Sequence, residues 1–156
     1  MRQLFVVFAI LMSVLAGPHA FATEAQDVLN KALFESAEQG DLAKVQQALS
    51  NGAEINARDD GHVDLTALML ATDRGHIEVV KFLLSKGVDV NLRSEMEINA
   101  LFYAVQHEYL SIALEFLALP NIDLFMLDIR DNTVFDYVKN GVATGDPKWV
   151  AFQDVL

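Results

Sequence analysis

The sequence repeats itself at intervals of about 34 residues. Eight positions carry the same or similar residues at an offset of 35, namely Leu33, Gly40, Leu42, Val45, Leu49, Gly52, Ile55 and Asn56, matched by Leu68, Gly75, Ile77, Val80, Leu84, Gly87, Val90 and Asn91. A third copy follows at an offset of 33, and a shorter fourth copy carries Thr133, Phe135 and Val138. This period predicts a stack of similar units, because one unit alone cannot bury its apolar face.

Each unit has the pattern of two helices joined by a turn and followed by an extended link. In the best copy, residues 66–71 open a short helix and residues 73–76 form the turn. Apolar residues at helical spacing mark residues 77–85 as the second helix. Gly87 then ends that helix, because glycine readily adopts the left-handed conformation of a C-cap.

These residues resemble the ankyrin repeat, whose motif G-x-T-P-L-H-x-A-x-x-x-G-H-x-x-V-V-x-x-L-L-x-x-G-A-D-V-N is matched by Leu65-Thr66-Ala67-Leu68-Met69-Leu70-Ala71, Gly75-His76, Val79-Val80, Leu83-Leu84 and Gly87-Val88-Asp89-Val90-Asn91. The resemblance covers about residues 32–139. It implies an all-α solenoid of stacked helix-turn-helix units with extended finger loops. We expect about four units, including two caps, at about 24–60, 61–94, 95–128 and 129–156. The resemblance also implies protein binding on a rigid scaffold.

The sequence departs from the repeat in three places. Val63 and Asp64 lengthen the first finger by two residues. Glu108 stands in the place of Gly75, and Asn121 in the place of Gly87. Because Glu adopts a left-handed conformation less readily than Gly or Asn, we expect the third unit to be irregular at its first turn.

The N-terminus has the order of a secretory signal. A short basic start is followed by an apolar run over residues 4–16, by Gly17-Pro18 and by the small-x-small sequence Ala20-Phe21-Ala22. We therefore expect a cleaved signal peptide at 1–22 and a single repeat domain at 23–156, with an uncleaved anchor as the alternative. The predicted location is the periplasm in a Gram-negative bacterium, and secretion otherwise. The apolar run is too short for a membrane span, and no second segment offers one.

Both ends of the array carry capping signals. Residues 23–26 have capping-box spacing and predict a long first helix from Thr23 through Glu38. Asp146-Pro147 predicts the start of a last helix, in which Trp149 and Phe152 cover the end of the core.

Charge and composition exclude several classes of function. The formal net charge is −11 without a basic stripe, so nucleic acid is not an expected partner. The chain has no Cys, which excludes disulfides, Cys-ligated zinc and a thiol nucleophile. His76 is predicted to be a structural turn residue, and no histidine has metal-ligand spacing. We expect no catalytic residue, no metal site, no cofactor and no enzymatic activity.

In an ankyrin-like stack, the fingers and the variable positions of the short helices line one concave face. One such position carries Glu35, Leu70, Tyr103 and Tyr137 in successive units, and we expect a stripe that runs from acidic to aromatic. The alternative is that the two tyrosines pack half-buried between neighbouring helices. The other predicted contact residues are Arg58, Asp59, Asp60, His62, Asp64, Asp73, Arg74, Arg93, Glu95, Met96, Glu97, Gln106 and His107.

The sequence supports two classes of function. The first is a non-catalytic binding module that acts as adaptor or inhibitor of another exported protein with a basic surface or cleft, and an immunity protein that neutralises an exported toxin or enzyme is its specific form. We expect such a protein to be monomeric. The second is a structural or stress-related envelope protein, which predicts self-association.

Overall fold

The computed structural model describes the backbone of residues 18–59, 64–145 and 147–154, and the side chains of these residues except 18–22, 148 and 151. Most of the predicted signal peptide lies outside the described residues. Its cleavage and the unit boundaries therefore stay predictions.

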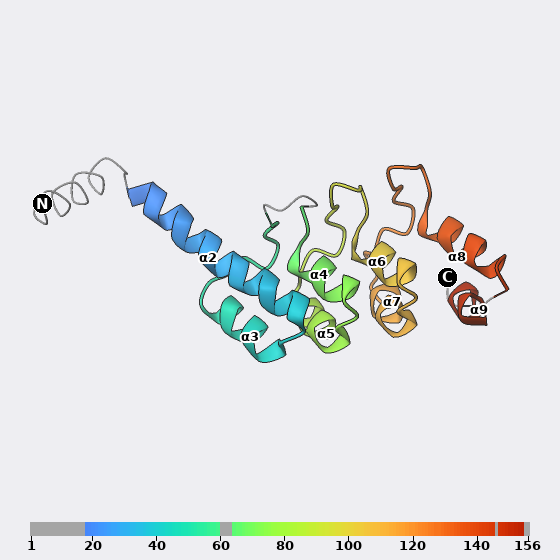
Figure 1. Cartoon of the computed structure of the whole chain (residues 1–156), viewed down its shortest axis with the longest axis horizontal. Coiled ribbons are helices and arrows are strands. Elements are labelled where there is room, and N and C mark those ends of the chain that lie inside the picture. The colour runs from blue at the N-terminus through green and yellow to red at the C-terminus, as the bar shows by residue number, and fades with distance from the viewer. Residues whose placement is uncertain (1–17, 60–63, 146, 155–156) are drawn as a thin grey trace, which may run out of the picture.

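Pairs of antiparallel helices follow one another along the long axis of the described molecule (Figure 1). The pairs are α2 (Pro18–Gln39) with α3 (Leu42–Ser50), α4 (Ala67–Asp73) with α5 (Ile77–Ser85), α6 (Ala100–Gln106) with α7 (Leu110–Leu117), and α8 (Val134–Val142) with α9 (Pro147–Gln153). The links between pairs rise on one side as the first finger (described at 54–59 and 64–66), the second finger (88–99) and the third finger (122–133). The predicted all-α solenoid with finger loops is confirmed.

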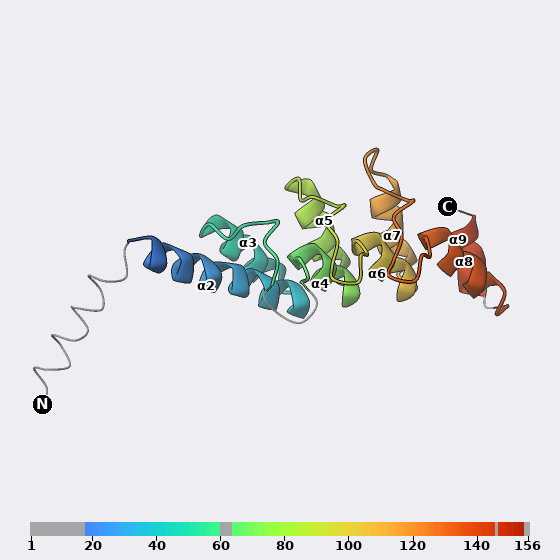
Figure 2. The ribbon, with the colours of Figure 1, turned by 90° about the horizontal axis from the view of Figure 1, so that it is seen from above.

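The helices form two rows. The first helices α2, α4, α6 and α8 pack in sequence, and α3, α5 and α7 form a second row beside them (Figure 2). The core between the rows contains fully buried side chains from every unit, among them Leu33, Leu68, Leu83, Phe116 and Phe152. Burial of each such side chain stabilises the fold by about 1.5–3 kcal/mol, so the stack is held mainly by contacts between neighbouring units.

Each finger ends at a residue that caps the N-terminus of the next helix. The side chains of Thr66, Asn99 and Thr133 accept hydrogen bonds from backbone N–H groups in the first turns of α4, α6 and α8. These caps satisfy donors that have no partner within the helix. They also fix the direction in which each first helix leaves its finger.

The first turn of the third unit is regular, contrary to the expectation. Glu108 adopts a left-handed φ of 60°, close to the 76° of Gly75. The next residue closes both turns in the same way, with Tyr109 N–H donating to Ala104 O at 2.8 Å and His76 N–H to Ala71 O at 2.8 Å. Asn121, in the place of Gly87, does not adopt the left-handed conformation of that glycine. Its carbonyl oxygen instead accepts from the Asn91 side chain at 2.7 Å.

The last helix begins at Pro147 and covers the end of the core as predicted, while the predicted capping residue Asp146 lies outside the described residues. Trp149 of α9 packs on Gly141 of α8, where a Cβ atom would lie 2.0 Å from the indole ring. Phe152 is fully buried, and its ring centroid lies 5.7 Å from that of Trp149. α9 therefore closes the end of the core mainly through α8.

The first helix is longer than expected. α2 begins at Pro18, five residues before Thr23, and runs through the predicted capping box. Proline is compatible with a first helical position, because its missing N–H needs no partner there. None of the helices in the described ranges is long and apolar enough to cross a membrane.

Candidate functional site

The first helices and the fingers enclose a groove of about 580 Å³ near the N-terminal end of the stack. It lies between α2, the first finger and α4. The groove is lined by Asp27, Val28, Asn30, Lys31, Phe34, Glu35, Glu38, Arg58, Asp59 and Leu70. Four of these side chains are carboxylates and two are cations, so the groove is acidic at neutral pH.

The groove brings together four of the predicted contact residues, Glu35, Arg58, Asp59 and Leu70. The lining residues on α2 before Glu35 were not predicted from the sequence. Asp27, Lys31 and Phe34 recur at helical spacing with Glu35 and Glu38, and this periodicity could have identified them as one face of α2.

A polar chain connects the ends of the first helices across three units. Arg74 pairs with Glu38 at 2.6 Å and with Asp73 at 3.5 Å, and His107 Nε2 lies 2.9 Å from Asp73 Oδ1. The hydrogen bond to Glu38 raises the pKa of Arg74, with further contributions from the Asp73 and Glu38 charges. The predicted residues Asp73, Arg74 and His107 therefore lie together.

His76 has the structural role that was predicted. Its ring lies over Gly40, where a Cβ atom would be 2.5 Å from Nδ1. Its Nε2 atom lies 2.9 Å from the carbonyl oxygen of Glu38. His76 thus joins the first two units.

The second finger presents an acidic and partly apolar tip. Glu95, Glu97 and Met96 are exposed, and Arg93 pairs with Glu97 at 3.3 Å. Arg58 of the first finger binds both Asp64 and the carbonyl oxygen of Arg93, so the first two fingers are joined.

The structure decides between the two alternatives for the tyrosines. Tyr103 is only 5% exposed and Leu70 only 9%, so the expectation that they form part of an exposed stripe was wrong. Tyr103 is buried within the stack, whereas the small exposed part of Leu70 lines the acidic groove. Tyr137 is half-buried, and its hydroxyl donates to Asp128 Oδ2 at 2.7 Å. Gln106 is exposed and lines a smaller hollow with Arg130 and Tyr137.

Asp128, which the finger pattern of the sequence places on the binding face, is instead a buried carboxylate. It is 7% exposed and accepts from the backbone N–H groups of Arg130 and Asn132 at 2.8 Å, as well as from the Asn132 amide and Tyr137. Burial alone raises the pKa of Asp128, but these hydrogen bonds together hold the pKa below its ordinary value. The charged carboxylate therefore organises the third finger.

Tyr103 has no such acceptor. Its hydroxyl makes no hydrogen bond within the described ranges. Burial raises the pKa of Tyr103, and the nearby side chain of Ser94 partly offsets this rise. The two hydroxyl groups do not, however, meet the geometry of a hydrogen bond. Ser94 occupies the place in the second finger that Asp128 occupies in the third.

Acidic residues also occupy a strained position in each finger. Asp64, Glu97 and Asp131 have φ values of 52°, 60° and 59°, two residues before each N-cap. The ankyrin motif carries Gly there, since a left-handed residue with a Cβ atom costs about 1–2 kcal/mol.

Two predicted contact residues, Asp60 and His62, lie outside the described residues. Within the described ranges, no group of three or more His, Cys, Asp or Glu side chains is arranged to hold a metal ion.

A family model for ankyrin repeats, in three copies, matches residues 33–128. The comparison with curated proteins finds no match. The matched residues extend from the core of α2 into the third finger and contain the N-caps Thr66 and Asn99 and the turns at Gly75 and Glu108, whereas Thr133, α8 and α9 lie beyond them. Proteins of this kind are generally protein–protein interaction modules and typically non-catalytic. With more than half of its length matched and its helix pairs stacked as a solenoid, the chain belongs to the ankyrin-repeat family.

Proposed function

We propose that this chain is an exported, non-catalytic adaptor or inhibitor that binds another exported protein through its concave face. The observation that carries the proposal is the acidic groove between α2 and the first finger. Helix α2 and the first finger form its walls, and the buried core beneath holds both in place. Such a rigid groove can bind a partner without first ordering a loop.

The charge of the groove indicates the chemistry of the partner. Arg58 is already paired with Asp64, so Lys31 of α2 is the one lining cation without an ion pair among the described residues. The whole chain is strongly acidic, so its field attracts a basic protein and accelerates association. We therefore expect the partner to insert a Lys- or Arg-bearing segment, with Phe34 and Val28 contacting its apolar parts.

The test compares two charge reversals. Glu35→Lys places a cation in the groove, whereas Glu78→Lys changes the same charge in the exposed first turn of α5, in the other row of helices. Cross-linking in the cell envelope, followed by purification and mass spectrometry, should recover a stoichiometric partner with the wild type and with Glu78→Lys. Glu35→Lys should lower the recovery of this partner by at least about 10-fold, because one like-charge contact costs more than about 1.4 kcal/mol. Equal recovery by both variants, or no partner at all, would contradict the proposal.

Export is tested separately. N-terminal sequencing of the protein from fractionated cells should show Thr23 as the first residue and place the protein outside the cytoplasm. An intact N-terminus in the membrane fraction would support the anchor alternative. A purified partner enzyme then distinguishes inhibitor from adaptor, because only an inhibitor lowers its turnover.

A further inference from the structure

The sequence contains two Asn-Gly pairs, Asn51-Gly52 and Asn140-Gly141. Asparagine before glycine is prone to deamidation, because glycine has no Cβ atom to keep its backbone nitrogen away from the asparagine side chain. In a folded protein the reaction also requires the backbone at the pair to rotate. The rate at each pair therefore depends on how firmly the fold holds it.

Asn51-Gly52 lies in an exposed turn at the end of α3. Both residues are exposed, and Asn51 is the C-cap of the helix. Gly52 has a φ of 101°, and its N–H donates to Leu49 O at 3.1 Å. A Cβ atom at Gly52 would lie 3.9 Å from Leu29 Cδ1, an ordinary contact that leaves the backbone room to move. Helix ends open more readily than helix interiors, so rotation at this pair disturbs little of the fold.

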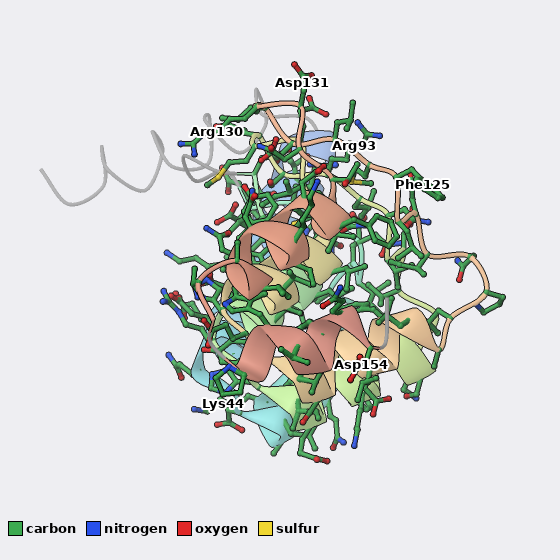
Figure 3. The ribbon with its side chains drawn as sticks, turned by 90° about the vertical axis from the view of Figure 1, so that its right-hand side faces the viewer. Lys44, Arg93, Phe125, Arg130, Asp131 and Asp154 are labelled. Carbon is green, nitrogen blue, oxygen red and sulfur yellow. The ribbon has the colours of Figure 1, made fainter. Side chains whose placement is uncertain are left out.

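Asn140-Gly141 is held more firmly, because it lies within α8 and beneath α9. Gly141 is buried, and a Cβ atom there would lie 2.0 Å from the indole ring of Trp149. Figure 3 views the stack from its C-terminal end and shows α8 and α9 against each other, nearest the viewer. Rotation at this pair must therefore break the last turn of α8 and displace α9.

We propose that Asn51 is a site of spontaneous deamidation in the folded protein, whereas the fold protects Asn140. The backbone nitrogen of Gly52 attacks Asn51 Cγ, the bond from Cγ to Nδ2 breaks, and ammonia leaves with the proton of the Gly52 N–H. Water then opens the cyclic imide. Attack of water at Cγ gives aspartate, and attack at the backbone carbonyl carbon gives isoaspartate, in which the chain continues through the side chain. Water is the co-reactant, and the modification goes beyond the proposed function.

Both products change the turn that holds α2 in place. The carbonyl oxygen of Gly52 accepts from Gln26 Nε2 at 3.0 Å, and the N–H of Glu54 donates to Asn30 Oδ1 at 2.8 Å. Either product places a negative charge at the C-terminal end of α3, where the helix dipole disfavours it. Isoaspartate also inserts a further backbone atom before Gly52. The modification therefore loosens this part of α2, and Asn30 itself lines the acidic groove.

The first experiment follows both pairs by peptide mass spectrometry. Protein purified from cells that express the full chain is incubated in mildly alkaline buffer, both folded and in concentrated urea. In the folded protein, Asn51 should convert to the acid at least about 10-fold faster than Asn140, whereas in urea the two rates should agree within about threefold. Asn51→Gln, which cyclises far more slowly, should abolish the product at this position. Equal rates in the folded protein, or faster conversion of Asn140, would overturn the proposal.

The second experiment measures how the modification affects α2. Ion exchange separates the deamidated protein by its added negative charge, and the peptide map identifies Asn51 as the modified residue. Amide hydrogen exchange over residues 27–33 should become at least about 10-fold faster, while exchange in α6 stays the same. Asn51→Asp carries the charge without the further backbone atom and should show a smaller increase. Unchanged exchange over residues 27–33 would contradict the loosening of α2. Neither experiment involves a partner, so each outcome is independent of the proposed function.

Discussion

The second and third fingers share one backbone plan but stabilise it differently. Ser94 N–H donates to Ile98 O at 2.9 Å, and Asp128 N–H donates to Asn132 O at 3.0 Å. The side chain of Ser94 accepts one hydrogen bond, from Met96 N–H, whereas the side chain of Asp128 accepts from two backbone and two side-chain groups. The second finger has a neighbour on each side, and the third has one only on its N-terminal side among the described residues. A finger at the end of a stack must therefore stabilise itself from within.

The largest loss of stability is expected when the third finger loses its buried carboxylate. Asp128→Ala removes the acceptor of several buried donors and should lower the free energy of unfolding by about 3 kcal/mol. Ser94→Ala, the matched change in the second finger, should cost only about 1 kcal/mol. Urea unfolding measures both, and equal losses would show that the two fingers are stabilised alike.

Gly141→Ala tests how tightly α9 packs on α8, the helix after the third finger. Alanine in place of glycine normally stabilises a helix by about 1 kcal/mol. Here the added Cβ atom would overlap Trp149, so we expect a net loss of about 2 kcal/mol by thermal unfolding. Asn140→Ala, at the adjacent exposed position of α8, should be neutral or slightly stabilising. A gain for Gly141→Ala would mean that α9 moves away without cost.

Removing the hydroxyl group from Tyr137 and from Tyr103 compares how much each hydroxyl stabilises the protein. Tyr137→Phe breaks a hydrogen bond to a charged carboxylate and should cost about 1.5 kcal/mol. Tyr103→Phe removes a buried hydroxyl that makes no hydrogen bond to the described residues, so its cost should be below about 0.5 kcal/mol. The same denaturant titration measures both. A large loss at Tyr103 would reveal a partner for its hydroxyl.

Ser94→Asp transfers the carboxylate of the third finger to the second. It gives the Tyr103 hydroxyl an acceptor and should stabilise the protein by about 1 kcal/mol at pH 7. The gain should disappear in a Tyr103→Phe background, which a double-mutant cycle detects. A gain that persists without the hydroxyl would have another cause.

Acidification should weaken the C-terminal end first, because two of the three described carboxylates with a lowered pKa lie there and the third, Asp41, caps α3. Hydrogen bonds lower the pKa of Asp128 despite its burial, and Thr133 lowers the pKa of Asp136 in the first turn of α8. A carboxyl group whose pKa is lower in the folded state stabilises the protein above its ordinary pKa. This contribution is lost as the pH falls through the folded value, below about pH 4. The chain has one tryptophan, Trp149, on α9. Its fluorescence should therefore change at a higher pH than the far-UV circular dichroism, and coincident transitions would contradict the expectation.

Much of the fold could be predicted because the repeat places the same residue types at the same structural positions. The N-caps, the His76 turn and the C-terminal cap all follow from local patterns. The prediction for Glu108 failed because the contacts of the stack impose the turn even on a residue that disfavours it. Of the residues that line the groove, the sequence identified Arg58 and Asp59 of the first finger, Leu70 of α4 and, on α2, only Glu35.

The period and the apolar pattern of the sequence determined a stacked all-α array by themselves, because each unit needs a neighbour to bury its core. Only the tertiary structure decided which equivalent positions are exposed. Leu70 and Tyr103 occupy the same place in consecutive units as Tyr137, yet the first two are buried and the third is half-buried. Asn91 and Phe125 are likewise equivalent, but the third finger contacts Asn91 while Phe125 remains exposed. The reason is that the exposure of a residue in a stack depends on the adjacent unit, and a local pattern carries no information about that unit.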